Sequence, residues 1–252
     1  MNSYPKFEKG MILKKEMLTA LRDYPRDILA LMYQDYGVGI ITGFHTQIND
    51  DNSIVIAPGI IKLDQGIFSL EEEVTLETYE GQHYVYLKLE TINSVDMVIT
   101  KVSIIQSKEF VEENIELFRY TKNAKLLPYS SFNDVGDNSI TNRVNKAVCK
   151  YAVQGGSSIA PEYLQLFASE LLKKGSNSMF DYAFATQCLA GDVSIVLRNE
   201  YLNKLSKTAS TEYNNEAVLR LLKLKIQSLD HIDDIKEKPE EVRNTPKKIK
   251  VL

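Results

Sequence analysis

The chain has 252 residues, 44% of them hydrophobic and 25% charged, so it is long enough to bury a sizeable core in one or two domains. Its formal net charge of -4 argues against non-specific binding of nucleic acid, which relies on many cationic contacts. No stretch approaches the roughly 20 apolar residues of a membrane-spanning helix, the first residues lack the apolar core of a signal peptide, and two cysteines make no disulfide framework. We therefore expect a cytoplasmic protein, or part of a particle assembled in the cytoplasm, with no direct membrane insertion and no nucleic-acid partner.

The first part of the chain, residues 1–36, is predicted to be an arm followed by a helix. The arm carries one large apolar residue, Phe7, among mixed charges. From residue 14 onward the pattern becomes helical, with Met17, Leu18 and Leu21 on one stripe and Ile28, Leu29 and Met32 on another. Pro25 interrupts this pattern, and a proline there removes a backbone donor and crowds the preceding turn. We expect two short helices or one kinked helix.

Residues 37–127 are predicted to form an antiparallel β-sandwich-like domain. Short runs rich in Ile, Val and Phe suit a pleated, half-buried surface. Turns are expected at Asn49–Asn52, Pro58–Gly59 and Asp64–Gly66. Longer strands are expected at 82–92, 96–106 and 115–121, the first because its apolar residues alternate with polar ones and tyrosines.

The second half is predicted to be helical, so the fold class is α+β: a β-sandwich-like domain followed by an up-and-down helical bundle. A polar linker at 128–138 precedes the bundle, at 139–232, and residues 233–252 form a flexible tail. Helices are expected at 140–151, 161–174, 178–190, 193–205 and 219–229. Gly155–Gly156 is interpreted as the stop of the first of these helices.

The sequence carries no pattern typical of catalysis. His45, His83 and His231 are far apart, and none has a second ligand at metal spacing. The acidic turn at Asn49–Asn52 lacks the spaced ligands of a calcium loop, and Gly155–Gly156 lacks the lysine of a phosphate-binding loop. We predict no catalytic residue, no cofactor and no metal.

The run from Phe7 to Leu13, Phe-Glu-Lys-Gly-Met-Ile-Leu, resembles the opening of type VI secretion baseplate subunits of the TssK kind. The order of an arm, a β-sandwich shell domain and a helical bundle is also similar. Gly39–Gly43 followed by Ile54–Gly59 resembles segments of phage baseplate and tail-fibre adaptor proteins. The resemblance implies a trimeric connector whose shell domain grips other baseplate or tail proteins and whose bundle holds the subunits together.

These observations predict a non-enzymatic structural subunit of a phage-tail-like contractile injection machine, oligomeric through its helical bundle. The expected partner-contact residues are three in the arm and four on the apolar seam of the last helix: Phe7, Gly10, Met11, Leu219, Leu222, Ile226 and Leu229. The alternative is a carbohydrate- or receptor-binding module in which Tyr84 and Tyr86 of the β-domain stack on a sugar.

Overall fold

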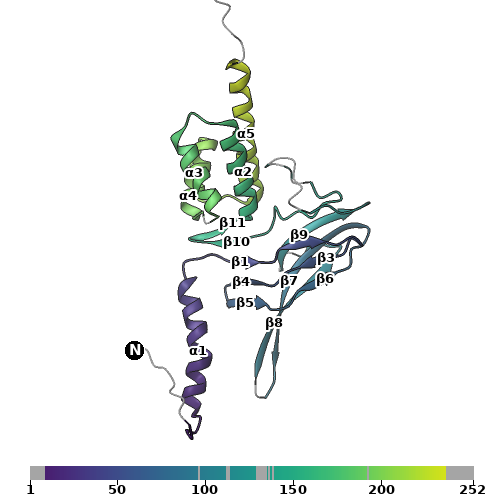
Figure 1. The fold of residues 1–252 in the computed structure, drawn as a ribbon, viewed down its shortest axis with the longest axis vertical. Coiled ribbons are helices and arrows are strands. Elements are labelled where there is room, and N and C mark those ends of the chain that lie inside the picture. The colour runs from purple at the N-terminus through teal and green to yellow at the C-terminus, as the bar shows by residue number, and fades with distance from the viewer. Residues whose placement is uncertain are drawn as a thin grey trace, which may run out of the picture.

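The computed structural model describes residues 9–95, 97–111, 114–128, 135, 137, 139–191 and 193–236. Three parts follow one another along the long axis of the molecule (Figure 1). A single helix, α1 (Lys15–Met32), lies at one end, the β-sheets lie in the middle, and four helices form a bundle at the other end.

The central sheet has five strands in the order β11-β10-β1-β4-β5. These strands are β1 (Gly39–Gly43), β4 (Gly59–Leu63), β5 (Gly66–Leu70), β10 (Tyr151–Val153) and β11 (Gly156–Ser158). Neighbours are antiparallel except β1 and β10, which are parallel with Ile40 opposite Tyr151. The sheet therefore combines strands from both halves of the sequence.

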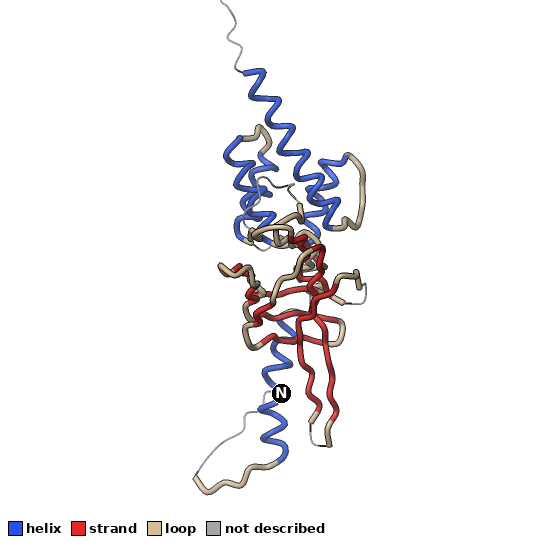
Figure 2. Tube along the Cα trace, turned by 90° about the vertical axis from the view of Figure 1, so that its right-hand side faces the viewer, coloured by secondary structure: helices blue, strands red, loops and turns tan. Residues whose placement is uncertain are grey.

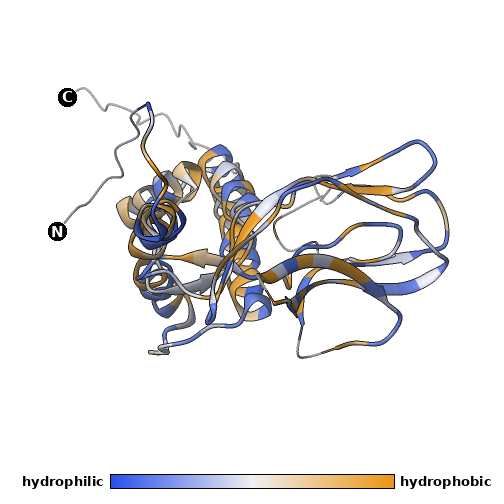
Figure 3. Cartoon of the chain, turned by 90° about the horizontal axis from the view of Figure 1, so that it is seen from below, coloured by the Kyte–Doolittle hydropathy of each residue, from blue (hydrophilic) through white to orange (hydrophobic). Residues whose placement is uncertain are grey.

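Two three-stranded antiparallel sheets complete the β-region, in the orders β2-β3-β6 and β8-β7-β9. The first contains β2 (Thr46–Ile48), β3 (Ile54–Ile56) and β6 (Val74–Leu76). The second contains β7 (Gly81–Asn93), β8 (Val98–Ser107) and β9 (Ile115–Lys122). In β3, Ile54 and Ile56 are buried and Val55 between them is half-buried, because successive side chains point to opposite faces. Figure 3 shows hydrophobic and hydrophilic residues mixed along the strands.

Two of the three predicted turns join paired strands. Asn49–Asn52 connects β2 to β3, with Asn52 at φ 65°, and Asp64–Gln65 connects β4 to β5. The turn at Pro58–Gly59 is different, because it carries the chain from β3 in one sheet to β4 in another. Gly59 does not have a positive φ; a glycine fits here because a side chain at this position would overlap the Phe44 ring at 2.4 Å.

The bundle contains α2 (Pro161–Lys174), α3 (Met179–Ala190), α4 (Ile195–Ser206) and α5 (Asn215–Lys236). The predicted boundaries agree with the structure at several ends. Pro161 opens α2 and Gly191, in the left-handed conformation, ends α3. The hydroxyl of Ser194 then accepts a hydrogen bond from the Leu197 amide and caps α4.

The predicted helix at 140–151 is wrong. Residues 141–145 instead make isolated bridges to the end of β9 and to Leu127, and the chain then enters β10. Gly155, at φ 83°, forms the turn between β10 and β11 rather than a helix stop. All three residues of β10 are buried, and a short run of apolar residues buried on both faces has no periodicity that separates strand from helix.

Of the two alternatives expected around Pro25, two short helices is wrong, because α1 runs through Pro25 as one helix of 18 residues; a kink in that helix stays a prediction. Proline costs a helix one backbone hydrogen bond. Here the residues on either side continue the helix nonetheless.

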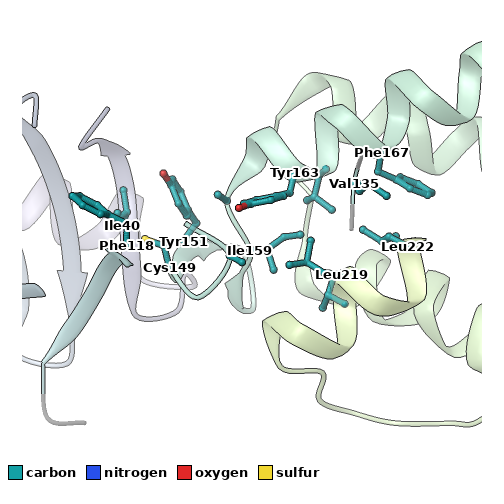
Figure 4. Close-up of a cluster of buried hydrophobic side chains, with 14 of the residues drawn as sticks. Ile40, Phe118, Val135, Cys149, Tyr151, Ile159, Tyr163, Phe167, Leu219 and Leu222 are labelled. Carbon is teal, nitrogen blue, oxygen red and sulfur yellow. The ribbon is translucent and has the colours of Figure 1, made fainter. Parts of the chain in front are cut away.

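One continuous hydrophobic core joins the sheets to the bundle (Figure 4). Ile40 and Phe118 lie on the β side, Tyr151 and Ile159 lie between, and Leu222 lies on the bundle side. Each of these side chains is at most 6% exposed. Because β10 and β11 lead directly into α2, the bundle is fixed to the sheet by packing as well as by the chain.

Arg198 of α4 adds polar contacts to this junction. Its side chain is 1% exposed, and burial lowers its pKa to about 10, so it remains charged at neutral pH. The guanidinium donates hydrogen bonds to the Ser157 carbonyl, the Ser158 hydroxyl, the Asn199 side chain and the Tyr213 carbonyl. Its five donors thus connect α4, β11 and the segment before α5.

Asp181 connects three bundle helices. Its carboxylate, 4% exposed, accepts hydrogen bonds from the Tyr201 hydroxyl at 3.0 Å and from Ser176, and pairs with Lys225 at 2.6 Å. Burial alone would raise the pKa of Asp181, but the bonds from Lys225, Ser176 and Tyr201 outweigh it and hold the pKa below its usual value. The charged form is therefore the one that the folded bundle stabilises.

Replacing Asp181 by Asn is expected to destabilise the protein by about 3 kcal/mol, because Lys225 then lies at a mostly buried position without its counter-charge. Urea unfolding measures the loss. The matched control is Asp230→Asn, which breaks the exposed pair with Lys174 between α2 and α5 and should cost less than about 1 kcal/mol. Equal losses of unfolding free energy in the two variants would contradict the conclusion that the Asp181–Lys225 pair stabilises the bundle more than the exposed Lys174–Asp230 pair does.

The same carboxylate predicts a pH dependence. Because the pKa of Asp181 is lower in the folded than in the unfolded chain, its contribution is present above the unfolded value of 3.8 and is lost as the pH falls through the folded value. The difference in unfolding free energy between wild type and Asp181→Asn should therefore shrink below pH 3.8. A difference that stays constant from pH 7 to pH 3 would refute this.

Candidate assembly surface

α1 turns its polar side toward its own chain. Five residues of the helix, three charged and two apolar, line a cleft whose other wall is the β4–β5 hairpin, residues 62–68: Asp23, Arg26, Asp27, Leu29 and Ala30. The charged residues in this wall are Asp23, Arg26 and Asp27. No residue of α1 is buried. The helix therefore faces the sheet across a cleft that charged and apolar residues both line, and no residue of the helix is buried there.

The apolar residues of α1 lie on the opposite side. At about 100° per residue, Leu21 and Ile28 fall nearly opposite Ala30, and neighbouring apolar residues widen the face on both sides. We call six of these residues the α1 stripe: Leu18, Leu21, Tyr24, Ile28, Leu31 and Met32. Their side chains are between 38% and 66% exposed.

This orientation is the reverse of that in an ordinary surface helix, whose apolar face covers the core of its own domain. Single exposed apolar residues are common, but a contiguous apolar face marks a site where another molecule binds. Met11, Ile12 and Leu13, just before α1, are also at least 50% exposed and extend the apolar region. Among the described residues, none therefore covers the apolar face of α1.

Lys62 of β4 holds α1 in this orientation. Its ammonium group donates hydrogen bonds to the carbonyls of Tyr33, Gln34 and Tyr36, at 3.1 Å for Gln34. The last turn of α1 contains no basic residue of its own. A cation at this end satisfies free carbonyls and opposes the helix dipole, so Lys62 supplies what the helix lacks.

Replacing Lys62 by Met is expected to loosen α1 without unfolding the rest of the chain, because the three carbonyls at its end lose their shared donor. Amide hydrogen exchange in α1 should accelerate several-fold, while exchange in α2 to α5 stays unchanged. Lys88→Met, which removes an exposed lysine paired with Glu90, serves as the control. Unchanged exchange in α1 of Lys62→Met would show that the lysine does not position the helix.

A second exposed apolar group lies at the tip of the β7–β8 hairpin. Ile92, Val95, Met97 and Val98 are each at least 56% exposed. The hairpin extends beyond the sheets in the same direction as α1, in both side views (Figures 1 and 2). The two exposed apolar regions thus share one end of the molecule.

The structure separates the predicted partner-contact residues into two groups. Leu219, Leu222, Ile226 and Leu229 of α5 are at most 5% exposed, because α5 packs against α2 and α4. Their apolar seam is used inside the chain. Gly10 and Met11 are exposed close to the start of α1, whereas Phe7 lies outside the described residues.

The tyrosines proposed for sugar stacking are not both accessible. Tyr86 is 0% exposed, and its hydroxyl accepts a hydrogen bond from the Val111 amide at 2.8 Å. Tyr84 is half-buried, with the Arg119 guanidinium 5.2 Å from its ring centre. Phe110 covers both rings. The expectation that Tyr86 faces solvent is therefore wrong, and Tyr84 alone remains for stacking.

The titratable groups inside the described part of the chain serve the fold. Burial raises the pKa of the Cys149 thiol to about 12, which keeps it protonated, and that of Cys188 likewise. His83 is buried and stacks on Tyr120, whereas His45 is exposed. Among the described residues, no three His, Cys, Asp or Glu side chains gather as a metal site, and no helix there is long and apolar enough to span a bilayer.

The signal for the surface is in the sequence. Apolar residues recur at steps of three or four along 18–32, a spacing typical of one face of an amphipathic helix. Periodicity says nothing about whether that face is covered by the same chain or by another. Only the structure shows which face of α1 lies toward its own chain, because it places the β4–β5 hairpin beside Asp23, Arg26 and Asp27.

The sequence matches no protein-family model and no curated protein. Among solved structures, the chain resembles one described as the crystal structure of TssK, with 10% identity over 90% of this chain and 72% of that chain, and a TM-score of 0.41. This is a distant structural resemblance and assigns no family.

Proposed function

We propose that this chain is a non-enzymatic structural subunit that assembles with other protein chains through α1. The observation that carries the proposal is the reversed orientation of α1, with charged residues toward its own sheet and the α1 stripe in solvent. Burying such a face against protein is favourable by roughly 25 cal/mol per Å² of apolar area. The energy for assembly therefore resides in a helix that the chain's own core does not use.

The type of assembly that we propose is the baseplate of a phage-tail-like contractile injection machine, in which the chain connects baseplate parts to a fibre or an anchor. The similarity of residues 7–13 to the opening of TssK-type subunits supports this choice. A trimer, and a cytoplasmic location or one in a particle assembled there, follow from the same similarity. We place the contact at α1 rather than at the seam of α5, because that seam is buried within the chain.

The purified protein is expected to form a stable oligomer at micromolar concentration, and Leu21→Glu/Ile28→Glu is expected to reduce it to a monomer. Two carboxylates in the middle of the α1 stripe cannot be buried without a large desolvation cost. The fold should survive, because no residue of α1 is buried. Light scattering gives the mass and circular dichroism the helix content.

The matched control is Leu172→Glu/Leu189→Glu, which changes two bundle leucines with 40% and 45% exposure, similar to Leu21 and Ile28. This variant should keep the mass of the wild type. A wild-type protein that is monomeric at micromolar concentration and retains no partner through α1 would refute the proposed function.

A further inference from the structure

We infer that the α1 stripe is covered by the α1 helices of other copies of this chain, and that these helices run parallel. The inference deepens the proposed function, on which it rests, by naming the partner and its direction. Its evidence is the distribution of charge along the two borders of the stripe.

One border of the stripe is basic and the other is acidic. At about 100° per residue, Lys15, Arg22 and Arg26 follow the stripe on the side of Leu18. Asp27 and Glu16 lie on the opposite border, beyond Leu31. Arg22 pairs with Asp23 of its own helix, but its side chain is 67% exposed and such a pair contributes little, so the guanidinium is free to exchange partners.

This division of charge selects a direction. In a parallel assembly of identical helices, the basic border of each helix faces the acidic border of the next, as the e and g positions do in coiled coils. In an antiparallel pair, each border faces its own copy, so like charges meet. Opposite borders therefore favour parallel helices by attraction and disfavour the antiparallel pair by repulsion.

The width of the stripe fits contact with more than one neighbour. From Leu18 to Leu31 the apolar residues cover about 140° of the helix circumference, which is wider than the narrow seam of a two-stranded coiled coil. A closed ring of copies, each touching two others, would cover such a face.

The shape of the chain permits this arrangement. α1 extends away from the sheets and joins them only at its C-terminal end (Figures 1 and 2). In a parallel bundle all the sheets then lie at one end, and the cleft on the polar side of each α1 stays on the outside.

The charges of α1 do not fit a lipid surface. Helices that lie on anionic membranes carry a surplus of Lys and Arg on their polar face. The three basic residues of α1, Lys15, Arg22 and Arg26, are balanced by the three acidic residues Glu16, Asp23 and Asp27. This balance favours protein as the partner.

Disulfide cross-linking tests the direction. In the parallel arrangement, Met32 lies beside Met32 of a neighbouring copy. In an antiparallel arrangement, Met32 instead faces Leu18 of the neighbour, so the two copies of Met32 are about 21 Å apart (14 residues at 1.5 Å each). Met32→Cys is therefore expected to form a dimer under mild oxidation. The native Cys149 and Cys188 are both 0% exposed and do not compete. Met179→Cys, with 82% exposure on the bundle, is the control that should stay uncross-linked.

A swap of the two borders tests the charge argument. Glu16→Lys/Asp27→Lys makes both borders basic, so like charges face each other and dissociation should occur at a several-fold higher protein concentration. Adding Lys15→Glu/Arg22→Glu gives the first border a net negative charge, although Arg26 remains, so opposite charges face each other again and the dissociation concentration should fall back towards that of the wild type. Sedimentation over a dilution series at low salt measures both.

Rapid cross-linking of Met32→Cys, with restoration in the fourfold variant, supports the inference. Cross-linking only in a mixture of Met32→Cys with Leu18→Cys would overturn it in favour of antiparallel helices. An oligomer without any α1 cross-link would overturn it but leave the proposed function standing, while a monomer that also retains no partner through α1 would remove both. A monomer that sediments with anionic phosphatidylserine vesicles would assign the stripe to lipid instead.

Discussion

The hydrogen bonds from Lys62 to the end of α1 determine which side of this helix meets solvent. Tyr33, Gln34 and Tyr36 contribute the carbonyls, and the lysine belongs to a strand in the middle of the central sheet. A charged donor to backbone carbonyls contributes more than a neutral hydrogen bond. Because α1 has no buried side chain, this polar contact replaces the apolar packing that usually sets the orientation of a helix.

At the other end of the molecule, buried contacts hold the sheet and the bundle together. The sheet and the bundle share one apolar core, and two buried charges, Arg198 and Asp181, are surrounded by hydrogen-bond partners. Buried charges with complete sets of partners fix one arrangement of the helices more than they add stability. The described part of the chain thus combines a closely packed body with one helix whose apolar residues are exposed.

Much of this fold can be predicted from the sequence, because its signals are local. Pro161 and Gly191 mark helix ends, the alternation of 82–92 marks a strand, and the 18–32 pattern marks an amphipathic helix. The predictions that were wrong concern residues whose structure depends on a segment far away in the sequence. β10 is a strand because β1 lies beside it, and Tyr86 is buried because Phe110 covers it. The same limit applies to the assembly surface, since the exposure of α1 depends on Lys62 and the β4–β5 hairpin.

The pairing of β1 with β10 has a consequence for dividing this chain into pieces. β1 has β4 on one side, and its other side is completed only by a strand that follows far along the chain, after β9. A fragment that stops at residue 127 would leave the backbone N–H and C=O groups of β1 unpaired on that side, and an unpaired edge recruits strands from other molecules. The β-region is therefore not a module that can be cut out at its apparent end in the sequence: its last two strands are encoded next to the bundle.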